Sequence, residues 1–125
     1  MQLLTFRIGA HLLALPAQNV TSVGREAGAA ATDGTAVLDL SALIDHGGQR
    51  PDRPPVIRCQ DGTRTVEMLV DRILGLEHCA DGDIRPWPGL LGHLALFGGT
   101  ALIGGRVFQL LDVPALMKRG KGRRR

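Results

Sequence analysis

Apolar and polar residues alternate along several short stretches of this chain, a pattern typical of β-strands with one face packed on a core. The clearest alternation spans residues 65–70, where one predicted face carries Val66, Met68 and Val70. The opposite face, with Thr65 and Glu67, is predicted to be partly wet. Asp61-Gly62 precedes this stretch, and Asp-Gly favours a type I′ turn, which requires positive φ at both central residues. The sequence therefore predicts a central β-hairpin that turns at Asp61-Gly62.

The remaining apolar stretches are also short and are separated by Gly and Pro. The chain contains 17 Gly and 7 Pro, so tight turns at Gly98-Gly99 and Gly104-Gly105 are expected rather than long helices. Further strands are predicted at residues 3–8, 12–15, 20–23, 35–40, 94–97, 100–103 and 106–111. Two short helices are predicted: 42–45 after a Ser41 cap, and a closing helix that follows Asp112 and runs to about Arg119.

Two parts of the chain end alike, with a strand, an Asp beside Leu and a short helix: VLDLSALI and QLLDVPALM. This similarity predicts an all-β fold with short helices, built as two small β-barrels that are each closed by a helix. At 125 residues the chain is expected to form one domain. We place the first subdomain at 1–48, a Pro-rich connector at 49–55, the second subdomain at 56–117 and a basic tail at 118–125.

The charge is unevenly distributed. The net charge is +3, but the tail holds six of the fifteen Lys and Arg, which leaves the rest with nine against twelve Asp and Glu. This is a mildly acidic domain with a basic tail, and aromatic residues make up only 3% of the chain. A nucleic-acid-binding surface with stacking platforms is therefore not expected. No signal peptide and no membrane-spanning apolar run is found, so a cytoplasmic protein with two reduced cysteines is predicted.

No catalytic constellation is visible, and no cofactor is expected. His78, Cys79, Asp81 and Asp83 crowd one segment, but a structural zinc site usually needs four well-spaced soft ligands. The paired glycines are followed by neither the helix nor the Lys of a phosphate loop. Three aspartates at predicted strand ends, Asp39, Asp71 and Asp112, are interpreted as caps or turn residues rather than as catalytic groups.

Three blocks of the sequence resemble the CheW-like domain, the adaptor module of bacterial chemosensory arrays. These blocks are LLTFRIGAHLLALPAQNVTSV, VIRCQDGTRTVEMLVDRILGLEHCADGDIRP and ALIGGRVFQLLDVPALM. The resemblance implies two SH3-like barrels. Here the first is shortened, because the chain passes from Gly24 through an Ala-rich stretch directly to Thr35 and lacks a strand of the family pattern.

The resemblance also implies a function. CheW-like domains are non-enzymatic scaffolds that couple the cytoplasmic tip of chemoreceptors to the regulatory domain of a CheA-type histidine kinase; other CheW-like domains are further candidate partners. The membrane would be approached only through receptors, and no nucleic acid is implied. Receptor contacts in the family surround the groove between the subdomains, which at matching positions points to Val20, Ser22, Val23, Val56 and Glu67. The family usually carries Glu where this chain has Ser22.

The basic tail supports an alternative function. A protein with this fold could bind a polyanion, either an anionic membrane surface or a nucleic acid, through Lys118, Arg119, Lys121, Arg123, Arg124 and Arg125. A solvated, disordered tail is the simplest interpretation, since charged runs at chain ends are commonly disordered. Binding through the tail would weaken steeply with added salt, whereas apolar contacts of the barrels would not.

Overall fold

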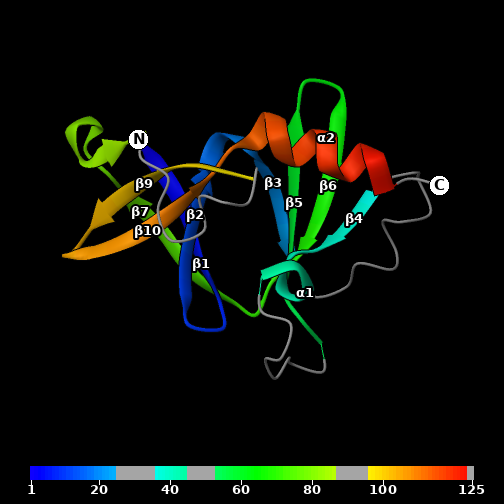
Figure 1. Cartoon of the computed structure of the whole chain (residues 1–125), viewed down its shortest axis with the longest axis horizontal. Helices are drawn as coiled ribbons and strands as arrows, with labels where there is room; N and C mark the ends of the chain where they lie inside the picture. The colour runs from blue at the N-terminus through cyan, green and yellow to red at the C-terminus, as the bar shows by residue number, and fades with distance from the viewer. Residues whose placement is uncertain (25–35, 45–52, 87–95, 124–125) are drawn as a thin grey trace.

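In the computed structural model, the described residues of this chain form two β-sheets and two α-helices (Figure 1). It describes residues 1–24, 36–44, 53–86 and 96–123, the last five of them as backbone only. In the described part of the chain, no helix is both long enough and apolar enough to cross a membrane. The predicted all-β class with short helices is confirmed.

In the part of the chain that the structure describes, the larger sheet has six strands, in the order β7-β1-β2-β10-β9-β8. Neighbouring strands are antiparallel except β2 and β10, which run parallel. The strands are β1 (Gln2–Ile8), β2 (His11–Pro16), β7 (Arg72–His78), β8 (Ile84–Arg85), β9 (Phe97–Ile103) and β10 (Arg106–Leu111). A 3₁₀-helix, η3 (Asp81–Asp83), connects the two outer strands, β7 and β8.

The smaller sheet has four strands among the described residues, in the order β3-β5-β6-β4. These are β3 (Val20–Gly24), β4 (Ala36–Asp39), β5 (Val56–Asp61) and β6 (Arg64–Leu69). The 3₁₀-helix η1 (Ala17–Asn19) leads from the larger sheet into β3, and the short α1 (Leu40–Ile44) follows β4. The pairs β3–β5 and β5–β6 are antiparallel, while β4 runs parallel to β6.

Each sheet combines strands from both predicted subdomains. From segment 1–48, β1 and β2 pair with β7 and β10, whereas β3 and β4 join β5 and β6. Segment 1–48 therefore contributes strands to both sheets. Alternation identifies each strand, but the partner of a strand is selected by packing between residues that are distant in sequence.

The buried apolar side chains form two hydrophobic clusters. The larger sheet curls around a small cluster made of Leu3, Ala14, Cys79, Ala101 and Phe108. Its other face packs on the smaller sheet through the main core, to which β1 contributes Leu4, Phe6 and Ile8 and β6 contributes Val66 and Met68. Strand β1 is consequently buried on both faces over Leu3–Phe6, where even Thr5 is only 1% exposed.

Helix α2 (Val113–Arg123) closes the main core. It packs against β4, β5 and β6 (Figure 1), with Val113, Leu116 and Met117 buried in the main core. Its N-terminus is capped as predicted, because the Asp112 carboxylate accepts a hydrogen bond from the Ala115 N–H at 3.3 Å. The helix continues past the predicted end near Arg119, although Gly120 and Gly122 are poor helix formers. Basic residues near a helix C-terminus interact favourably with the helix dipole, which supports this extension.

The cap of α1 differs from the prediction. Asp39, not Ser41, caps this helix, and its carboxylate accepts a hydrogen bond from the Ala42 N–H at 3.0 Å. Ser41 lies inside the helix, is buried, and donates its hydroxyl hydrogen bond to Asp71 at 2.7 Å. Both Ser and Asp are good caps, and the helix begins two residues earlier than the pattern indicated.

Two turns also differ from their predicted positions. In the central hairpin Asp61 is the last residue of β5 and pairs with Arg64, so the two-residue turn is Gly62-Thr63. Only Gly62 has positive φ there (65°), whereas a type I′ turn needs two such residues. Gly98-Gly99 is no turn at all, because both glycines lie inside β9. Gly104-Gly105 is the predicted turn, with φ of 58° and 79°.

Candidate docking groove

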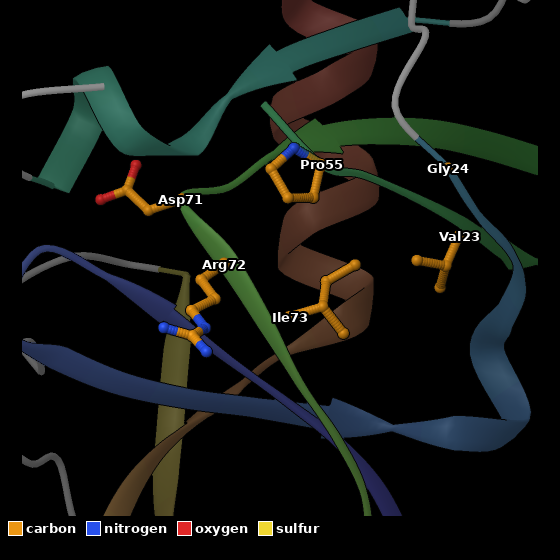
Figure 2. A pocket seen from close by; sticks show the side chains of 6 residues that line it. All are labelled: Val23, Gly24, Pro55, Asp71, Arg72 and Ile73. Atoms are coloured by element: carbon orange, nitrogen blue, oxygen red, sulfur yellow. The ribbon is translucent and has the colours of Figure 1, made fainter. Parts of the chain in front are cut away.

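A pocket of about 410 Å³ lies where the two sheets separate. It is lined by Val23, Gly24, Pro55, Asp71, Arg72 and Ile73. Figure 2 shows Val23 of β3 and Ile73 of β7 pointing toward one another, with Pro55 above them. We call this hollow the inter-sheet groove.

The groove exists because two outer strands diverge. β3 is the last strand of the smaller sheet and β7 the last strand of the larger sheet, so neither has a second neighbour in its sheet among the described residues. The chain crosses between the sheets at Val70 and Asp71, directly after β6. The Val70 N–H donates to the Pro55 carbonyl at 3.1 Å, which holds the crossover against the start of β5.

Asp71 fixes the base of the groove. Its Oδ2 accepts a hydrogen bond from the Gly9 N–H at 2.6 Å, and its Oδ1 accepts one from the Ser41 hydroxyl at 2.7 Å. Gly9 forms the β1–β2 turn and Ser41 belongs to α1, so one carboxylate connects the larger sheet to the helix beside the smaller sheet. The Asp71 N–H also donates to the Arg7 carbonyl at 3.2 Å. The interpretation of Asp71 as a turn residue is confirmed.

One of the five predicted contact residues lines the groove. Val23 is 47% exposed, which is unusual for a large apolar side chain in a folded domain. Ser22 is exposed on the same strand, and Val20 is half-buried against the main core. Of the three valines at the predicted contact positions, only Val23 is exposed.

Val56 and Glu67, two of the predicted contact positions, are buried and do not line the groove. Val56 is 4% exposed and pairs with Gly24 and Leu69 inside the smaller sheet. Glu67 is 3% exposed and forms an ion pair with Arg58 at 3.2 Å. Alternation correctly placed Glu67 opposite the main core, but it carries no information about what covers that second face.

The residues that sequence reasoning missed are Gly24, Pro55, Asp71, Arg72 and Ile73. They belong to strand ends and connections, which no periodic pattern brings together. A usable signal was the polar Asp71-Arg72 step between two apolar runs, because such a step marks the point where the chain leaves one sheet.

Both cysteines are buried free thiols in different clusters. Cys59 lies in the main core, and burial raises the pKa of its thiol from 9.0 to about 12. Cys79 lies in the small cluster and its thiol donates to the Leu102 carbonyl at 3.5 Å. Burial also raises the pKa of Cys79, with a further contribution from the Asp83 carboxylate. Within the described residues, no three His, Cys, Asp or Glu side chains gather as metal ligands.

The basic tail begins on α2. Lys118 is exposed on the helix. The structure describes only the helical backbone of Arg119, Lys121 and Arg123, and Arg124 and Arg125 lie outside the described residues. Helical backbone through Arg123 replaces the disordered tail that we expected.

Comparisons with known proteins agree with this architecture. The family model of the CheW-like domain matches residues 33–121. A solved structure, the scaffolding protein TtCheW from Thermoanaerobacter tengcongensis, superposes with a TM-score of 0.73 at 14% sequence identity, covering 89% of this chain and 88% of that chain. No curated protein sequence matches this chain. Because the family model spans well over half of its length, this chain belongs to the CheW-like domain family, a family of non-enzymatic scaffolds of chemotaxis signalling.

Proposed function

We propose that this protein is an adaptor in a bacterial chemosensory or motility signalling complex, where it couples chemoreceptors to a CheA-type histidine kinase. Membership of the CheW-like family supports a scaffolding role. The observation that carries the proposal is the accessible inter-sheet groove, with Val23 exposed between two outer strands. An exposed apolar side chain in a concave site commonly marks a partner surface.

The lining of the groove indicates what it can bind. Val23, Ile73 and Pro55 supply apolar contact, while Asp71 and Arg72 place one charge of each sign at the same site. Asp71 is already committed to two hydrogen bonds within the fold, and the Arg72 side chain lies on the opposite side of β7 from Ile73 (Figure 2). The groove therefore suits a segment that presents an apolar side chain to Val23, Ile73 and Pro55. We propose the cytoplasmic tip of a chemoreceptor as this segment.

The experiment measures binding of the wild-type protein to a receptor tip and to the regulatory domain of a CheA-type kinase, both from the same cell. Val23→Asp places a carboxylate that must be desolvated in the groove, so affinity for the receptor tip should fall at least about tenfold. Val107→Asp is the matched control, because Val107 is 55% exposed on β10 and does not line the groove.

The outcomes separate the possible partners. Loss of receptor binding in Val23→Asp alone, with kinase binding retained, supports the groove as the receptor site. Equal binding of the receptor tip by both variants would show that the groove is not its site. Failure of the wild-type protein to bind either partner would refute the adaptor function.

A further inference from the structure

Strand β7 leaves an open edge on the larger sheet. Its seven residues pair only with β1 among the described strands, and each of them is exposed or half-buried. Leu74 is 37% and Leu76 is 62% exposed, whereas the opposite outer strand, β8, has only two residues. Proteins usually shorten or charge such edges, because unpaired backbone groups recruit another strand. The central sequence of β7, Ile73-Leu74-Gly75-Leu76, carries no charge.

A bulge in β7 determines which of its residues share a face. The register with β1 shifts between Thr5 and Phe6, and the Thr5 hydroxyl donates to the Gly75 carbonyl at 3.0 Å at this point. Opposite residues of antiparallel strands share a face. Ile73 and Leu76 lie opposite Phe6 and Leu4, on the side of the main core, while Arg72 and Glu77 lie opposite Arg7 and Leu3, on the other side.

This arrangement is self-complementary. When two copies of one strand pair antiparallel about a two-fold axis, each residue lies opposite a residue of the other copy whose side chain points to the same face of the sheet. In an unbulged strand Arg72 and Glu77 would lie on opposite faces, because side chains alternate along a strand and the two positions differ by five. The bulge puts them on one face, at equal distances in sequence from the Leu74–Gly75 bond. Ile73 and Leu76 are related in the same way on the other face.

We propose that two copies of this chain form a dimer by antiparallel pairing of their β7 strands, with Arg72 of each copy opposite Glu77 of the other. The same register places Ile73 opposite Leu76 twice. The larger sheets of the two copies then continue into one another across the two-fold axis.

The charges identify a second copy as the occupant of this edge. Arg72 and Glu77 are both exposed, and neither forms a salt bridge within the described residues. They are five residues apart on one strand, about 16 Å, which is too far for them to neutralise each other within one chain. The two-fold register brings each Arg72 close to Glu77 of the other copy. It also covers Leu76, which is 62% exposed in the single chain. The N-terminal part of the edge borders the inter-sheet groove rather than a packed neighbour.

The test is sedimentation equilibrium of the protein alone, from about 1 to about 500 µM, a range suited to a small, weak interface. Arg72→Glu sets like charges opposite each other at two symmetric positions and should weaken dimerisation at least about tenfold. Glu77→Arg should do the same. The double variant Arg72→Glu/Glu77→Arg restores opposite charges and should restore the dimer. Arg64→Glu, an exposed arginine on β6, is the matched control and should not affect it.

A wild-type protein that stays monomeric throughout this range overturns the proposal. Two single variants that dissociate without rescue by the double variant overturn the register, as would dissociation by Arg64→Glu. Circular dichroism of each variant verifies the fold. Because receptor and kinase are absent from this assay, its outcome is independent of the adaptor function.

Discussion

Removing the Asp71 carboxylate should loosen the connection between the two sheets. In Asp71→Ala the Gly9 N–H and the Ser41 hydroxyl lose their acceptor at 2.6 and 2.7 Å. Hydrogen bonds to a charged group contribute about 1.5–3 kcal/mol each. Asp71 is half-buried, so solvent replaces part of this, and we expect the free energy of unfolding to fall by about 2–4 kcal/mol in total.

Urea unfolding followed by circular dichroism measures this loss. Asp81→Ala is the control, because the Asp81 side chain is 96% exposed and its contact with the N-terminal amine, at 3.9 Å, is a surface ion pair worth about 0–1 kcal/mol. Asp71→Asn keeps one acceptor oxygen and should lose less than Asp71→Ala. In a double-mutant cycle, Ser41→Ala should cost little once Asp71 is already Ala. A loss below about 0.5 kcal/mol in Asp71→Ala would refute the role assigned to this carboxylate.

Three further outcomes are expected. Gly99→Ala should destabilise the fold by about 1–3 kcal/mol, because its Cβ would lie 2.5 Å from the Arg85 carbonyl oxygen. Gly98→Ala is the control, since its Cβ meets only ordinary contacts at 3.7 Å. Equal melting temperatures of the two variants would contradict this reasoning. Below pH 9 the Cys59 thiol is protonated in both the folded and the unfolded protein. At higher pH the thiol ionises first in the unfolded chain, so the free energy of unfolding should fall as the pH rises from 9 to about 12. In Cys59→Ala, the urea midpoint should fall less over this pH range. If the tail binds polyanions, retention on heparin should fall steeply with salt and vanish when the tail is neutralised; salt-independent retention excludes that alternative.

Local structure was largely predictable from the sequence. Period-two alternation located most of the strands, although β7 and β8 were not predicted and β9 was predicted as two strands. The paired glycines at 104–105 located a true turn, because both adopt positive φ. Asp112 was identified as a cap from its position before an apolar helix. Short-range chemistry decides each of these features, so a short window of sequence is sufficient.

The candidate site was much less predictable. Val23 was identified from the sequence. Ile73 reaches the groove only because the chain leaves the smaller sheet after β6 and continues as β7, which pairs with β1. Burial of Val56 and Glu67 likewise depends on what covers the second face of the smaller sheet. Such contacts join residues that are distant in sequence, and neither alternation nor turn chemistry encodes them.

The parallel pairing of β2 with β10 has a consequence for biosynthesis. Residues 11–16 leave the ribosome early, but their partner strand is residues 106–111. The larger sheet therefore cannot be completed until residues 106–111 have been synthesised, and β2 lacks one of its two neighbouring strands until then. Folds dominated by such distant contacts fold slowly, within about milliseconds to seconds. During that interval the nascent chain exposes apolar strand edges, so we expect it to depend on chaperones more than a domain of local hairpins would.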